Sequence, residues 1–146
     1  METFKPKDFS IPKLSGISEK TIEEHLKLYK GYVNNANIIF NKLNELKSDP
    51  EKNSYLLAET QRRLGFEFGG MRNHEYYFSS LSNGSKEINK TGELYKKLVE
   101  DWGSFEVFLE HFKFVALTRG IGWSMLYFDK ESNKLIITWV DEQHIG

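Results

Sequence analysis

The sequence predicts an α+β fold, with helices in the first part of the chain and a β-hairpin near its end. Apolar residues recur at three- and four-residue steps between Ile22 and Leu81, as on one face of an amphipathic helix. Between Trp123 and Val140 the pattern changes to alternation and β-branched residues, which is typical of strands. This order, with helices first, strands second and no internal repeat, is typical of an α+β protein.

Composition excludes several classes of function. The chain has 146 residues, which suits one domain, and its 20 Lys and Arg against 21 Asp and Glu argue against a nucleic-acid partner. The sequence contains no cysteine, which excludes thiol catalysis and zinc knuckles. No apolar run approaches the ~20 residues of a membrane-spanning helix, and the first residues lack a signal-peptide pattern. We therefore expect a cytoplasmic protein that contacts no membrane.

The first half is predicted to be an antiparallel hairpin of two long helices. Ser18 is a good N-cap, and the acidic residues after it complement the helix dipole. Asp49-Pro50 breaks the helical pattern, because the residue before a proline avoids the helical region. Gly65, Gly69 and Gly70 weaken the second helix and indicate a close helix crossing. The predicted segments are an irregular arm at 1–17 and a hairpin at 18–84, whose first helix ends near Leu46 and whose second starts near Glu51 or Asn53.

Residues 85–146 are predicted to form two shorter helices and a two-stranded sheet. The first helix runs from Gly92 to Glu100, and Ser104 caps the second, which reaches Ala116. Turn-forming residues at 129–133 separate the two strands.

Two histidines are candidate metal ligands. At about 100° per residue, Tyr29 and Tyr32 fall about 40° and 20° from His25, so three polar heads share one stripe of the first helix. His74 lies near the middle of the second helix, and antiparallel packing can bring both imidazoles to one point. Each histidine alone is better explained as a helix residue with a hydrogen-bond partner than as a ligand. Two imidazoles with carboxylate and water ligands suit iron, manganese or zinc.

Five segments resemble the iron/manganese superoxide dismutase family, in the family's order and over most of the chain. They are ISEKTIEEHLKLYKGYVNNAN at 17–37, FEFGGMRNHEYYFSSLSNG at 66–84, DWGSFEVF at 101–108, GIGWSMLYF at 120–128 and KLIITWVDEQHIG at 134–146. The resemblance implies a helical hairpin followed by a partial C-terminal α/β domain at 85–146 with a truncated small sheet. It also implies conversion of superoxide to oxygen and hydrogen peroxide at a mononuclear iron or manganese site.

The resemblance implies roles for particular residues. His25 and His74 correspond to the family's first two metal ligands. Tyr32 resembles the gateway tyrosine beside the metal, and Trp123 resembles the tryptophan that walls the site. Gln143 corresponds to the outer-sphere glutamine, which hydrogen-bonds the metal's solvent ligand and tunes its redox potential.

The outer-sphere donor has an alternative. Gly70 stands four residues before His74, where another type within the family carries its own glutamine. The donor is therefore expected from the sheet region, as Gln143 or as the neighbouring His144.

Two departures affect the first helix. His25 and Tyr32 are one residue closer than in the family, so either the helix has lost a residue or Glu24 occupies the ligand position. We expect His25 to be the ligand, because the residues before it then stay in register. Leu28 and Tyr29 stand where the family usually has paired histidines, which implies a different set of hydrogen bonds at the gateway.

The third departure lies at the end of the sequence. The segments stop before the family's Asp-x-Trp-x-His motif, which supplies the third and fourth ligands, so we expect a fragment of a longer enzyme that forms a homodimer or homotetramer. The other interpretation is a natural short relative that recruits other carboxylates. The nearest such carboxylates in sequence are Glu24, Glu67, Glu75 and Asp141.

Two functions other than superoxide dismutation share features with this sequence. A catalytically inactive relative could serve as a structural or interaction domain. A helical di-iron carboxylate protein would repeat Glu-x-x-His, but Met71 stands three residues before His74. Arg62 and Arg63 are expected on a solvated helix face, with at most a role in guiding an anion.

Overall fold

The computed structural model describes residues 3–144, and these form two compact units. The first unit contains residues up to Ser85 together with Gln143 and His144, and the second contains Lys86–Glu142. Each unit has its own hydrophobic core.

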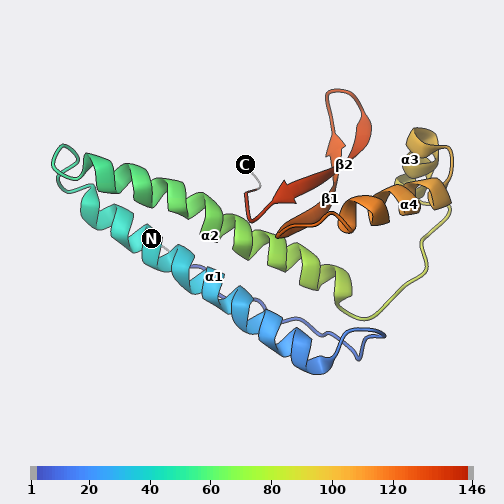
Figure 1. The fold of residues 1–146 in the computed structure, drawn as a ribbon, viewed down its shortest axis with the longest axis horizontal. Helices are drawn as coiled ribbons and strands as arrows, with labels where there is room; N and C mark the ends of the chain where they lie inside the picture. Colours follow the sequence, from blue (N-terminus) through green and yellow to red (C-terminus); the bar gives the residue numbers. More distant parts are fainter. Residues whose placement is uncertain (1–2, 145–146) are drawn as a thin grey trace. The chain divides into compact units, whose positions relative to one another are not determined.

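The first unit is built on the helical hairpin that the sequence predicts. Helices α1 (Glu19–Leu46) and α2 (Ser54–Leu81) run antiparallel, side by side (Figure 1). The Ser18 Oγ accepts a hydrogen bond of 3.1 Å from the Thr21 amide, which confirms the predicted N-cap. The helix break falls around Pro50, and α2 begins at Ser54.

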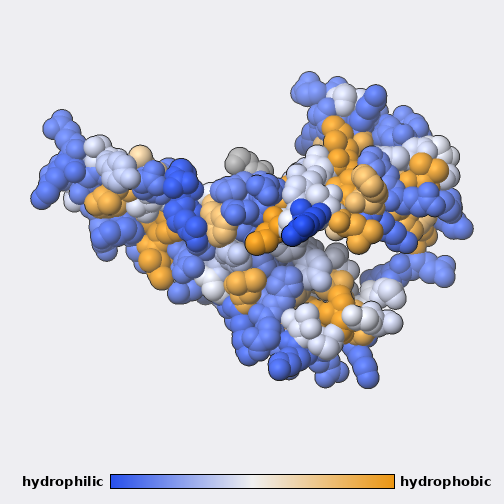
Figure 2. Space-filling view, viewed as in Figure 1, coloured by the Kyte–Doolittle hydropathy of each residue, from blue (hydrophilic) through white to orange (hydrophobic). Residues whose placement is uncertain are grey.

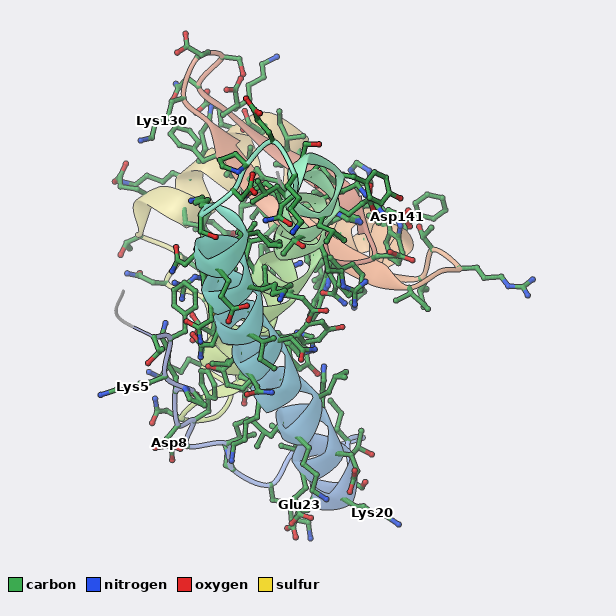
Figure 3. The ribbon with its side chains drawn as sticks, turned by 90° about the vertical axis from the view of Figure 1, so that its left-hand side faces the viewer. Lys5, Asp8, Lys20, Glu23, Lys130 and Asp141 are labelled. Atoms are coloured by element: carbon green, nitrogen blue, oxygen red, sulfur yellow. The ribbon has the colours of Figure 1, made fainter. Side chains whose placement is uncertain are left out.

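An arm without helix or strand precedes α1 and packs along the hairpin. Its aromatic residues point inward, since Phe9 contacts Tyr29 and Phe78 in the core. Its charged residues Lys5 and Asp8 project away from the hairpin (Figure 3). This alternation explains how an irregular segment stays attached, because each apolar side chain that it buries adds to the core.

The close approach predicted between the helices occurs at Gly70. A Cβ atom built there would lie 2.5 Å from Cδ1 of Tyr32, so only glycine fits. The same prediction is wrong for Gly65, whose added Cβ would meet no heavy atom within 4 Å. The glycine at 70 therefore brings the ring of Tyr32 on α1 against the backbone of α2.

The second unit joins two helices to a β-hairpin. Its elements are α3 (Glu93–Trp102), α4 (Phe105–Ala116), β1 (Gly122–Asp129) and β2 (Lys134–Asp141). The strands pair antiparallel, from Gly122 opposite Asp141 to Asp129 opposite Lys134. Helix α3 continues past the predicted end at Glu100, because the residue able to adopt the positive φ that ends it is Gly103, at 82°.

The face drawn in Figure 2 is mainly polar. On the face drawn in Figure 2, charged and polar residues surround small groups of apolar ones. Among residues 3–144, no helix has both the length and the hydropathy to cross a lipid bilayer.

Candidate metal centre

The imidazoles of His25 and His74 meet between the two long helices. Their ring centroids lie 4.8 Å apart with the planes at 79°, so one ring presents its edge to the other. His74 is 1% exposed and belongs to α2, while His25 lies nearly two turns after the start of α1. The antiparallel hairpin therefore brings together two residues that are far apart in the sequence, as the sequence analysis predicts.

His74 is fixed in one orientation by the backbone of its own helix. Its Nδ1 lies 2.6 Å from the carbonyl oxygen of Gly70, one turn earlier, and a neutral ring donates its proton there. Nε2 is then the nitrogen with a lone pair, the arrangement that metal-binding histidines use.

Burial keeps both rings in the neutral form. The pKa of His74 is lowered to about 4, chiefly by burial and also by the nearby His25, against the opposing effect of the hydrogen bond to Gly70. Burial also lowers the pKa of His25. At neutral pH both histidines therefore carry a nitrogen lone pair rather than a second proton, which is the form that binds a metal.

Aromatic rings enclose this pair. The Tyr32 ring lies 5.0 Å from His74, and the rings of Phe78 and Tyr77 lie 5.0 and 5.2 Å from His25. Phe78 is fully buried. The pair is thus surrounded by both phenyl and phenol rings.

The structure places His25, rather than Glu24, beside His74. Glu24, the alternative ligand, is exposed, and its carboxylate accepts a hydrogen bond of 2.7 Å from Lys27 Nζ. Helix α1 is a continuous α-helix in which His25 and Tyr32, seven residues apart, both face His74. Seven residues are close to two full turns, so the shortened spacing keeps both side chains on one face.

The sequence does not predict the buried carboxylate network that lies beside His74. Glu75 accepts hydrogen bonds from Arg72 at 2.6 Å and from Tyr29 at 3.2 Å, and Lys7 of the arm forms an ion pair with it at 2.8 Å. The Tyr29 hydroxyl in turn accepts a hydrogen bond from the Lys7 amide at 2.9 Å. Burial opposes ionisation of Glu75, but these cationic partners hold its pKa below the usual value. The network ties the arm to both helices.

The carboxylates named as alternative ligands do not join the histidines. Glu67 accepts two hydrogen bonds from Arg63, Glu75 belongs to the network above, and Asp141 lies at the end of β2 in the second unit. Within residues 3–144, no three His, Asp or Glu side chains gather as a metal-binding group.

The sequence contains part of the signal for these carboxylate pairs. Arg63 and Glu67 are four residues apart and Arg72 and Glu75 are three apart, spacings at which helical side chains meet. Burial of Glu67 and Glu75, at 3% and 5% exposed, depends on the packing of the opposite helix and of the arm, so spacing alone does not predict it.

The remaining predicted site residues come from the last part of the chain. Gln143 is buried within the first unit, whereas His144 is exposed and places its ring 5.7 Å from that of Phe66. Trp123 is on β1 opposite Val140, in the second unit. The catalytic roles of Gln143 and Trp123 stay predictions.

A helical hairpin that presents two neutral imidazoles to each other is typical of helical metal-binding proteins. Similarity to known proteins identifies the family. Residues 9–82 match the iron/manganese superoxide dismutases, alpha-hairpin domain, and residues 90–145 match their C-terminal domain. The chain belongs to the iron/manganese superoxide dismutase family.

Known relatives include enzymes named for either metal. The chain is 34% identical over 134 residues to superoxide dismutase [Fe] of Sulfolobus acidocaldarius, covering 89% of this chain and 64% of the relative. It is 36% identical over 115 residues to superoxide dismutase [Mn] of Mycobacterium marinum, covering 77% and 80%. Against superoxide dismutase [Fe] of Saccharolobus solfataricus it is 33% identical over 125 residues, covering 83% and 59%. The chain thus spans less than two thirds of the Sulfolobus and Saccharolobus proteins.

Proposed function

We propose that this chain acts in superoxide dismutation and binds one iron or manganese ion between His25 and His74. The observation that carries the proposal is the meeting of two buried imidazoles from opposed helices, 4.8 Å apart between ring centroids. Membership of the family supports the reaction, and relatives named for iron or for manganese support both metals.

The residues present fit such an ion. Neutral imidazoles are suitable ligands for iron and manganese, and the pKa of each ring is lowered by burial. The two rings supply part of a coordination sphere, which carboxylate and water ligands commonly complete. When bound, the metal would supply the one-electron transfers by which two superoxide anions and two protons become oxygen and hydrogen peroxide.

The protein's own residues would orient the ligands and handle the protons. The Gly70 carbonyl holds the ring of His74, and Phe78 shields the pair from bulk water. We assign to Tyr32 the transfer of a proton through its hydroxyl, because its ring contacts His74. Gln143 is proposed as the outer-sphere donor and Trp123 as a wall of the site.

The first test combines metal content with turnover. In a protein that also carries the family's third and fourth ligands, His25→Ala with His74→Ala should abolish retention of iron and manganese and the dismutase activity that depends on it. His111→Ala, which removes an imidazole that accepts a hydrogen bond from Trp102 on α3, should change neither. Full metal occupancy in the double variant, measured by elemental analysis, would refute the assignment.

A second test addresses the outer sphere. Gln143→Ala should retain the metal but shift its reduction potential, since the side chain is proposed to act through a hydrogen bond rather than as a ligand. Loss of the metal itself from this variant would contradict that role.

The number of subunits and the location in the cell can each be tested. We propose a homodimer or homotetramer in the cytoplasm; the assembly rests on the family resemblance and the location on sequence composition. Light scattering of the purified protein should give a mass of two or four chains, and cell fractionation should recover it in the cytoplasm. A single-chain mass across the micromolar range would reject the assembly.

A further inference from the structure

The end of helix α2 is followed by the one Asn-Gly dipeptide of the sequence, Asn83-Gly84. This dipeptide belongs to the first unit and lies in a segment without helix or strand, between Leu81 and Glu93 (Figure 1). The Asn83 side chain is exposed to solvent. Because glycine has no Cβ, the side-chain amide of the preceding asparagine meets no steric obstacle when it approaches the glycine nitrogen. The dipeptide therefore pairs a reactive carbonyl carbon with an unhindered amide.

The main chain of the dipeptide is loosely held on its glycine side. Both residues are in the left-handed region, with φ at 65° for Asn83 and 78° for Gly84, and this turn ends α2. The Gly84 N–H donates to the Leu81 carbonyl at 3.4 Å, which is longer than the usual distance of about 2.9 Å. The nitrogen of Gly84 is thus only weakly engaged in a hydrogen bond.

The dipeptide also has space around it. A cavity of about 570 Å³ lies beside it, and its wall includes Gly84 and Leu81 together with Pro12 and Leu14 of the arm. Among the described residues, a Cβ built at Gly84 would meet one heavy atom within 4 Å, Cγ of Pro12 at 3.4 Å. Gly84 can therefore shift toward the Asn83 side chain without a clash, and water can reach its amide.

We propose that Asn83 is a site of spontaneous deamidation, a covalent modification that requires water and no enzyme. The Gly84 nitrogen attacks Cγ of Asn83, and the bond between Cγ and Nδ2 breaks. Nδ2 leaves as ammonia with the proton of the Gly84 amide, and the main chain then contains a cyclic succinimide. Water opens either carbonyl–nitrogen bond of this ring, which yields an aspartyl or an isoaspartyl residue at position 83. Nothing is oxidised or reduced, and the chain gains a negative charge.

The modification weakens the attachment of the arm to α2. The Asn83 N–H donates to the Ser10 carbonyl at 2.9 Å, a bond that joins the arm to the end of the helix. A new carboxylate at this position lies near the negative end of the helix dipole, where it is unfavourable. An isoaspartyl residue also adds a methylene to the main chain and displaces Gly84 from Pro12. The arm therefore loosens as the protein ages, whether or not the chain is a dismutase.

The test follows the purified chain during incubation at mildly alkaline pH and locates deamidation by peptide mass spectrometry. Asn133 is the internal control, because it is also exposed and has a positive φ of 54°, but Lys134 follows it. Deamidation should be about tenfold faster at Asn83 than at Asn133, a difference of about 1.4 kcal/mol in activation free energy. Equal rates at the two positions would overturn the proposal.

The chemistry of the product is tested in the same samples. The rate at Asn83 should rise in proportion to hydroxide concentration, because the Gly84 amide must lose its proton to attack. An isoaspartyl-specific methyltransferase with S-adenosylmethionine should label the isoaspartyl fraction. A deamidated product without any isoaspartate would show direct hydrolysis of the side chain and would contradict the succinimide route.

Two glycine variants test the role of Gly84. Gly84→Ala adds a Cβ that hinders the attack and should slow deamidation at Asn83 about tenfold. Gly16→Ala, at a φ of 84°, imposes a similar backbone penalty while the dipeptide stays intact, so the rate should be unchanged. Local unfolding exposes the dipeptide and accelerates the reaction, so a slower reaction in Gly84→Ala cannot come from lost structure. An unchanged rate in Gly84→Ala would refute the proposal.

A final pair of variants tests the effect on the arm. Asn83→Asp reproduces the aspartyl product, and hydrogen-exchange protection of its amide, corrected for the intrinsic rate, should fall about threefold. Asn133→Asp adds the same charge in the turn between the strands and should leave the protection of the Asn83 amide unchanged. Equal protection in both variants would contradict the predicted loosening of the arm.

Discussion

At residue 70, the absence of one carbon atom allows Tyr32 to lie against the second long helix. An added Cβ would approach Cδ1 and Cε1 of that ring to 2.5 and 2.6 Å. The same glycine supplies the carbonyl that orients His74. Gly70 therefore supports two site residues although it has no side chain of its own.

Gly70→Ala should destabilise the protein by about 1 to 2 kcal/mol, because the strain of overpacking exceeds the gain in helix propensity. Gly65→Ala, the matched control in the same helix, should stabilise it by up to about 1 kcal/mol, since its Cβ would meet no atom within 4 Å. Urea unfolding of both variants checks the difference. Equal effects would mean that the contact with Tyr32 is not restrictive.

At the scale of elements, hydrogen bonds and an ion pair join the irregular arm to α1 and α2. The Tyr29 hydroxyl is the central atom, because it accepts from the Lys7 amide and donates to Glu75. Burial is the main cause that raises the pKa of Tyr29, so the hydroxyl keeps its proton at neutral pH.

Tyr29→Phe should cost about 1 to 2 kcal/mol of unfolding free energy, since the buried Glu75 carboxylate and the Lys7 amide each lose a hydrogen bond. Tyr76→Phe is the control, because Tyr76 is 63% exposed on α2 and should contribute little. Chemical denaturation followed by circular dichroism measures both. A loss in Tyr29→Phe no larger than in Tyr76→Phe would show that the arm is held by its aromatic contacts alone.

In the second unit, α3 and β2 are connected by Asp101. Its carboxylate accepts from the Leu135 amide at 2.8 Å and pairs with Lys97 at 3.1 Å. The hydrogen bond from Leu135 is the main cause that holds the pKa of Asp101 below its ordinary value of 3.8. The ionised form thus stabilises the fold above pH 3.8, and this contribution disappears as the pH falls through the lowered pKa.

Asp101→Asn should be less stable than the unmodified protein at pH 7, with the difference shrinking as the pH drops below about 3.8. Unfolding free energies measured from pH 7 to pH 2.5 test this dependence. A difference that stays constant over that range would indicate that the charge of Asp101 is irrelevant and only its shape matters.

For the whole molecule, the sequence predicts the elements better than their contacts. Local sequence signals predict several features: the N-caps Ser18 and Ser104, the helix break at Pro50 and the two strands. Each of these features begins or ends within a residue or two of its predicted position. The meeting of His25 with His74 was predictable because two long antiparallel helices leave few alternatives.

The electrostatic detail of the site was not predictable in the same way. Glu67 and Glu75 are acidic residues that a sequence pattern assigns to solvent, yet both are buried because Asn35, Lys7 and Tyr29 reach them from other segments. Such contacts join residues more than thirty positions apart, so they depend on how the hairpin and arm pack rather than on local spacing.

Paramagnetic broadening can test whether two imidazoles from opposed helices bind one metal ion. Substoichiometric Mn²⁺ added to the protein should broaden the NMR signals of the His25 and His74 rings together, while those of His111 persist. Broadening of one of the two rings alone, or the persistence of both at full Mn²⁺ loading, would contradict the shared site.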